Sequence, residues 1–97
     1  MKVDILIKKD HIDISCEGMY ILLLRKPMGE IQSARFSEPY TDQDIRRLLD
    51  TGIIEVTDSS DERILFFKTK RFHSEELLYL ILADLIKYKY QQEQYHG

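Results

Sequence analysis

Hydrophobic and polar residues alternate through the first part of the chain. Residues 2–8 place an apolar side chain at nearly every second position, which is typical of a strand with one wetter face. The alternation resumes at Ile12 and Ile14, after the polar dipeptide Lys9-Asp10. This pattern predicts two strands joined by a tight turn.

The next segment, residues 19–25, is apolar on both faces. Periodicity alone does not distinguish a buried strand from a buried helix in such a short run. The sequence Lys-Pro-Met-Gly that follows has proline second and glycine fourth, as a β-turn prefers. We therefore predict a hairpin over residues 19–36, with its first strand in the middle of the sheet.

Residues 41–51 carry the strongest helix signal in the first half of the chain. Thr41 can cap the first turn, and Asp44 can reach back to it, as in a capping box. Gly52 stands where a left-handed residue ends many helices. The apolar stripe of this helix is narrow and consists of Ile45, Leu48 and Leu49.

The second half of the chain predicts another hairpin and then a second helix. Residues 53–57 and 63–69 have the pattern of strands and flank a polar loop. Ser74 is expected to cap this helix, which runs to about Tyr90, and the polar tail from about residue 91 is expected to fray.

These elements fit a single α+β domain over residues 1–97, because a chain of 97 residues is too short for a second core. The predicted fold is an antiparallel sheet of four to six strands, made of two or more hairpins, with two helices. The C-terminal helix is the longer of the two and is amphipathic.

This C-terminal helix is apolar over an unusually wide sector. At about 100° per residue its apolar side chains cover about 220°, whereas a surface helix needs a stripe of little more than about 100°. We predict that Leu77, Ile81 and Leu85 face the sheet and that the other half meets a second copy across a two-fold axis. The alternative is a helix sunk into the core of one chain. The predicted dimer interface consists of Leu78, Tyr79, Leu82, Ile86 and Tyr90.

The net charge of −3 hides an uneven distribution. Residues 38–62 hold eight acidic and two basic side chains, whereas residues 63–73 hold four basic side chains and no acidic one. A concentrated acidic surface suits a protein partner better than nucleic acid. The predicted partner-binding residues are Asp50, Glu55, Asp58, Asp61 and Glu62.

No pattern of catalytic or metal-binding residues stands out. The four glycines are isolated, which excludes a phosphate-binding glycine loop. Cys16 and His11 are the nearest cysteine–histidine pair, but their spacing fixes no geometry for a nucleophile and its base. His11, Asp13 and Cys16 also lack the ligand spacing of a metal site. We therefore expect no enzyme activity, catalytic residue, metal or cofactor.

Three further features bear on location. A single cysteine cannot form an internal disulfide, which favours a reducing cytoplasm. The N-terminus lacks the apolar core of a signal peptide. The longest uninterrupted apolar run has seven residues, 77–83, where a membrane span needs about twenty.

One stretch, within residues 42–70, resembles a known family. Ile45-x-x-Leu48-Leu49-x-x-Gly52-Ile53-Ile54-Glu55, followed by a charged hairpin, is similar to the recognition helix and wing of winged helix-turn-helix domains. The resemblance implies that the helix enters the major groove and the wing touches the DNA backbone. The residues that would contact nucleic acid are Gln43, Arg46, Arg47, Arg63 and Lys68, to which the basic run adds Lys70 and Arg71.

Two functional hypotheses follow. The first is a small cytoplasmic protein-interaction or regulatory protein, of adaptor or inhibitor type, that acts as a homodimer and binds another protein. The alternative is a winged-helix-like DNA-binding transcriptional regulator. Neither hypothesis involves a membrane.

Overall fold

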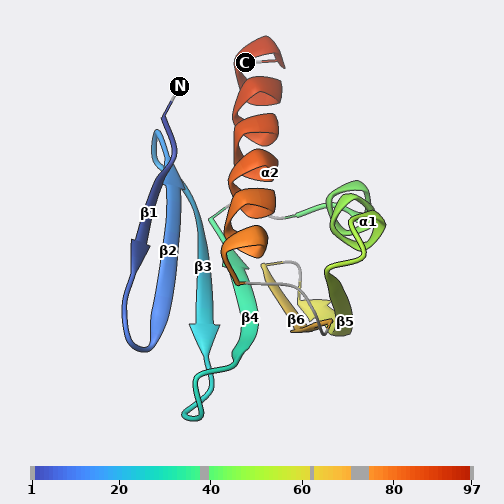
Figure 1. Ribbon diagram of the computed structural model, residues 1–97. Coiled ribbons are helices and arrows are strands. Elements are labelled where there is room, and N and C mark those ends of the chain that lie inside the picture. Colours follow the sequence, from blue (N-terminus) through green and yellow to red (C-terminus); the bar gives the residue numbers. More distant parts are fainter. Residues whose placement is uncertain (1, 38–39, 62, 71–74, 97) are drawn as a thin grey trace.

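The computed structural model describes residues 2–37, 40–61, 63–70 and 75–96. One antiparallel six-stranded sheet has the strand order β1-β2-β3-β4-β6-β5, with a long C-terminal helix across it (Figure 1). The predicted α+β fold is therefore confirmed. In chain order the elements are β1 (Asp4–Ile7), β2 (His11–Cys16), β3 (Met19–Arg25), β4 (Ile31–Phe36), α1 (Asp42–Asp50), β5 (Ile54–Asp61), β6 (Ile64–Thr69) and α2 (Glu75–His96).

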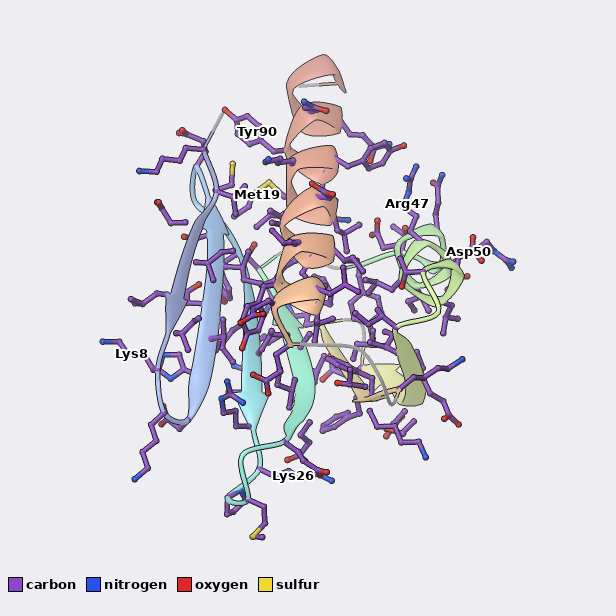
Figure 2. All side chains as sticks on the ribbon, viewed as in Figure 1. Lys8, Met19, Lys26, Arg47, Asp50 and Tyr90 are labelled. Atoms are coloured by element: carbon purple, nitrogen blue, oxygen red, sulfur yellow. The ribbon has the colours of Figure 1, made fainter. Side chains whose placement is uncertain are left out.

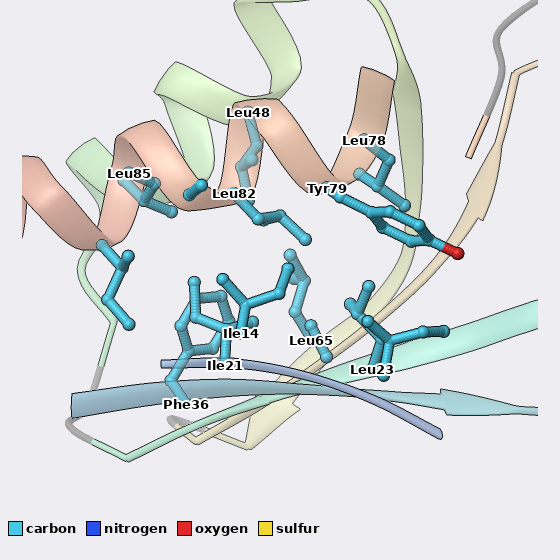
Figure 3. Packing of buried hydrophobic residues seen from close by; sticks show 14 of the residues in the cluster. Ile14, Ile21, Leu23, Phe36, Leu48, Leu65, Leu78, Tyr79, Leu82 and Leu85 are labelled. Carbon is cyan, nitrogen blue, oxygen red and sulfur yellow. The ribbon is translucent and has the colours of Figure 1, made fainter. Parts of the chain in front are cut away.

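The core lies between α2 and one face of the sheet (Figure 3). Alternation along β2 and β3 directs every second side chain to this face. The strand register sets Ile12 beside Leu23 and Ile14 beside Ile21, and each of these four side chains is at most 1% exposed. The strand β3 is interior to the sheet, as predicted, but its second face is not fully buried, since Leu24 is 37% exposed.

The predicted division of α2 into a sheet face and a dimer face is wrong for most of its residues, although Leu85 is buried in the core and Ile81 packs against it. Leu78, Leu82 and Ile86 are at most 1% exposed and Tyr79 is 5% exposed, because they pack into the core of the same chain. Leu77, which was predicted to face the sheet, is 40% exposed. The six-stranded sheet and α1 together cover more of the helix than a small sheet would. The predicted dimer interface is thus buried within one chain, with Tyr90 partly buried against the same core.

The helix α1 begins as the sequence predicted. The Thr41 hydroxyl accepts a hydrogen bond from the Asp44 backbone amide at 3.3 Å, and the Asp44 carboxylate accepts one from the Thr41 amide at 2.8 Å. Just beyond its end, Gly52 has a φ of +73°, a conformation in which a Cβ atom is strained.

Other boundaries differ from the prediction. The polar stretch expected as a loop belongs largely to β5, which pairs with β6 as far as Asp61 through two register shifts. Bulges of this kind absorb residues that do not fit a regular ladder. The α2 helix extends to His96, and the predicted cap at Ser74 lies outside the described residues.

The strands before α1 also bear on the winged-helix resemblance. Residues 19–25 and 31–36 form β3 and β4, where that family would have helices. The hairpin in the position of the wing is part of the six-stranded sheet. Among the parts of the chain that the structure describes, no helix is both long and apolar enough to cross a membrane.

Candidate interaction groove between the two helices

An ion pair sets the position of α1 relative to α2. Lys89 Nζ lies 2.6 Å from Asp44 Oδ2, and the two side chains are 14% and 6% exposed. A charge this far from water needs a close partner, because its desolvation is otherwise costly. The same carboxylate accepts the capping-box bond from Thr41, so the start of α1 is held by its own cap and by α2.

A second contact bridges the helices one turn further along α1. The guanidinium of Arg47 lies 3.8 Å from the centre of the Tyr88 ring, a cation–π arrangement. Figure 2 shows Arg47 extending from α1, which lies beside α2. Because Tyr88 and Lys89 are neighbours on α2, both contacts join the helices at the same level.

Between the helices lies a groove with a volume of about 340 Å³. Its floor is apolar, since Leu48 and Leu85 are buried and Ile81 is half-buried. Its rim carries the exposed carboxylates of Asp50 and Asp84. We call this the helix groove; it is lined by Arg47, Leu48, Asp50, Thr51, Ile81, Asp84, Leu85 and Tyr88.

The helix groove suits one kind of ligand. An apolar floor favours burial of an apolar side chain, and two carboxylates at the rim favour a nearby cation. The cation of the groove itself, Arg47, is already stacked on Tyr88. An amphipathic protein segment with lysine or arginine beside its apolar residues therefore complements this surface.

The structure does not bring the predicted acidic residues together at this groove. Asp50 lines it, whereas Glu55, Asp58 and Asp61 lie on β5, and Glu62 is outside the described residues. Glu55 lies 3.7 Å from the Lys68 ammonium. The Asp61 carboxylate accepts a hydrogen bond from the Arg63 backbone amide at 2.8 Å, across the tip of its own hairpin.

The residues predicted to contact nucleic acid are also dispersed. Arg47 is held by Tyr88, and Lys68 pairs with Glu55. Gln43 and Arg46 are exposed on α1, where Arg46 lines a shallow hollow of about 370 Å³ with Asp42, Ile45, Leu49 and Asp50. Exposed Arg63 and Lys70 lie on the β5–β6 side of the molecule, and Arg71 is outside the described residues.

The side chains considered for catalysis lie on opposite faces of β2. Cys16 is 2% exposed on the face covered by α2, whereas His11, an odd number of residues away, points to the other face. His11 bonds instead to the Asp10 carboxylate at 2.7 Å, which lowers the pKa of Asp10. In the described ranges no three histidine, cysteine or acidic side chains are placed to hold a metal ion.

A polar cluster that the sequence did not predict holds the other end of α2. Arg25, at the end of β3, donates to both carboxylate oxygens of Glu75 at 2.8 and 2.9 Å, and Tyr79 donates to Glu75 at 2.7 Å. The hydrogen bonds from Arg25 are the largest cause of the lowered pKa of Glu75, and burial is the largest cause of the raised pKa of Tyr79. Tyr79 is thus a partner of Arg25 and Glu75 within one chain.

Sequence reasoning missed Asp84 and Tyr88 as groove residues and Lys89 as the cation that pairs with Asp44. Asp84 and Lys89 have the appearance of ordinary solvent-facing charges on a helix. The Asp44–Lys89 pair joins residues 45 positions apart, so no local sequence pattern predicts it. The spacing of Ile81, Leu85 and Tyr88 along one side of α2 was the available signal.

Comparisons of this chain with protein-family models, with curated proteins and with solved structures found no match.

Proposed function

We propose that the protein is a small non-enzymatic interaction or regulatory protein, of adaptor or inhibitor type, which acts in the cytoplasm as a homodimer. The observation that carries this proposal is the helix groove, with its apolar floor and its two rim carboxylates. Its partner is a protein segment that is amphipathic and basic. The buried thiol of Cys16 suits a reducing compartment.

The test uses two synthetic helical peptides with the same apolar positions, one carrying lysines and the other glutamates. Amide chemical shifts of the labelled protein are followed during titration. We expect the lysine peptide to bind and to shift the signals of Leu48, Ile81 and Leu85, because these form the floor of the groove. Equal binding of both peptides, or shifts that avoid the groove, would contradict the proposal.

A matched pair of variants separates the groove from general attraction to an acidic protein. Asp84→Lys changes the rim, whereas Glu76→Lys makes the same change of charge at another exposed position of α2. We expect Asp84→Lys to weaken the lysine peptide about tenfold or more and Glu76→Lys to weaken it much less, since screened charges act mainly at short range. Equal losses would mean that only net charge is sensed.

The DNA-binding alternative has less support, because its cations are dispersed among the described residues and Arg47 is engaged within the chain. Arg47 stacks on Tyr88 and Lys68 pairs with Glu55. A titration with mixed-sequence duplex DNA over a salt series distinguishes the two functions. Tight binding with a steep loss of affinity as salt rises would favour the DNA-binding function, and no binding at low salt would favour a protein partner.

A further inference from the structure

The first strand, β1, forms an open edge of the sheet. It pairs with β2 on one side, and every residue of it is exposed. Ile5, Leu6 and Ile7 are 39%, 52% and 58% exposed. Successive residues point to opposite faces, so apolar surface lies on both sides of the edge. A strand of this kind is a template for pairing with another strand.

The hydrogen bonds to β2 determine which backbone groups point outward. The Lys8 amide donates to the His11 carbonyl at 2.8 Å. Bonded and non-bonded residues alternate in an antiparallel pair, so Asp4 and Leu6 also direct their backbone groups toward β2. The amides and carbonyls of Ile5 and Ile7 therefore point away from the sheet and are oriented to accept a further strand.

Charge selects one register for pairing with a second copy. When Leu6 lies opposite Leu6 of the second copy, Asp4 lies opposite Lys8, and the symmetry of the pairing makes this contact twice. A shift centred on Ile5 places Lys2 opposite Lys8, whereas a shift centred on Ile7 places Lys8 opposite Leu6 and sets Asp4 against the β1–β2 turn, with no facing charge. Opposite charges stabilise facing positions and like charges destabilise them, so the register centred on Leu6 is favoured over the Ile5 register, which sets like charges together, and over the Ile7 register, which has no facing pair of opposite charges.

The same register satisfies the backbone and the apolar side chains. It places Ile5 opposite Ile7 of the second copy, and these are the two residues whose backbone groups point outward. Leu6 then meets its own copy on the other face. Within the single chain Asp4 has a loose contact with Lys2 at 3.9 Å, and both side chains are strongly exposed. The helix α2 packs on β2 and β3, which leaves β1 accessible (Figure 1).

We propose that a second copy of this chain binds antiparallel to β1 in the register centred on Leu6 and joins two six-stranded sheets into one. This contact would form the homodimer of the proposed function, so the inference rests on the proposed function for the dimeric state. It does not involve the helix groove. It also replaces the α2 surface, which is buried within the chain.

A charge swap tests the register. Asp4→Lys alone sets lysine against Lys8 twice, because the interface is symmetric, and Lys8→Asp alone sets two pairs of aspartates together. The double variant, Asp4→Lys with Lys8→Asp, restores opposite charges. We expect each single change to weaken dimerisation about tenfold or more and the double change to recover most of the loss. Light scattering coupled to gel filtration over a dilution series measures the dissociation constant.

Circular dichroism checks that each variant is folded, which we expect because all the changed side chains are exposed. A wild-type monomer at high micromolar concentration would overturn the proposal, as would single variants that dimerise like the wild type or a folded double variant that fails to recover. Peptide binding at the helix groove is measured on the monomeric single variants. Absence of peptide binding would count against the proposed partner site, whereas binding by the monomeric variants would show that the groove functions without the dimer. A failure of the dimer proposal is therefore distinguishable from a failure of the proposed function.

Discussion

The two edges of the sheet differ in how they meet other strands. The β5 edge is eight residues long, has two register shifts, carries Glu55, Asp58 and Asp61, and packs against α1. The β1 edge has four residues in regular register and exposes large apolar side chains. Bulges and charges are the features by which natural sheets prevent edge-to-edge contact. The chain therefore protects one edge and leaves the other suited to pairing.

The two sides of the sheet also differ in how they are joined to the rest of the chain. Near β5, α1 is held by the Asp44–Lys89 pair and by the stacking of Arg47 on Tyr88. Near β1, Val3 is partly buried against the core, whereas the residues of β1 itself are exposed and α2 packs on β2 and β3. Changes on the β5 side are thus expected to affect the stability of the chain, and changes on the β1 edge to affect its association.

The largest expected effect concerns α2, the competing dimer surface. Leu82→Glu places a carboxylate at a position that is 1% exposed, where no partner compensates its desolvation. We expect the chain to lose its cooperative fold, as seen by circular dichroism and amide spectra. A folded monomeric Leu82→Glu variant would contradict the burial of this face. It would indicate that the dimer forms through α2 and not through β1.

The next effect breaks the anchoring on the β5 side. Lys89→Met leaves the Asp44 carboxylate without its cation, which should lower the free energy of unfolding by about 3 kcal/mol. Lys87→Met is the control, since Lys87 is a half-buried cation on the same helix. Urea denaturation measures both variants. Similar losses in the two would mean that the ion pair adds nothing specific.

The next prediction concerns Gly52, which lies between α1 and β5, just before the protected edge. Gly52→Val forces a β-branched residue into a left-handed conformation and should cost about 1 kcal/mol or more. Gly52→Asn should cost less, because asparagine adopts this conformation more readily. Thermal melts of the two variants measure the difference. Equal melting temperatures for wild type and Gly52→Val would show that the helix end is not constrained.

The smallest effect depends on pH. The hydrogen bonds from Arg25 lower the folded pKa of Glu75 below its ordinary value of 4.5. The resulting stability is fully present above that value and is lost as pH falls through the lower folded pKa. Glu75→Gln should therefore lower the free energy of unfolding by about 1 kcal/mol or less at neutral pH, because Glu75 is partly exposed. The difference from wild type should vanish in acid; a constant difference would contradict this role.

The sequence predicted the elements of the fold because their signals are local. The capping box at Thr41 and Asp44, the positive φ of Gly52 and the alternation in β1 and β2 each depend on neighbouring residues. The orientation of α2 was not predictable in this way. Its apolar side chains cover so wide an arc that Leu77 and Leu78 were equally plausible on the inner face, and the packing of sheet and α1 decided between them.

The same distinction applies to the candidate site. Asp50 was predicted from the charge distribution, but the other carboxylate at the rim, Asp84, lies on α2, far from Asp50 in the sequence. The contacts that place the two helices join residues more than forty positions apart. The exposed edge at β1 was visible as an alternating segment, whereas its position at the end of the sheet required the strand order.

A cysteine cross-link tests the central claim, pairing through β1, most directly. In the register centred on Leu6, Leu6 and its copy form a non-hydrogen-bonded pair with Cα atoms about 4.5 Å apart, which is within reach of a disulfide. In a Cys16→Ala background, mild oxidation of Leu6→Cys should therefore give a covalent dimer on a non-reducing gel. Ile5→Cys and Ile7→Cys report the two neighbouring registers and should cross-link poorly. Cross-linking of either control in place of Leu6→Cys, or of none of the three, would contradict the account.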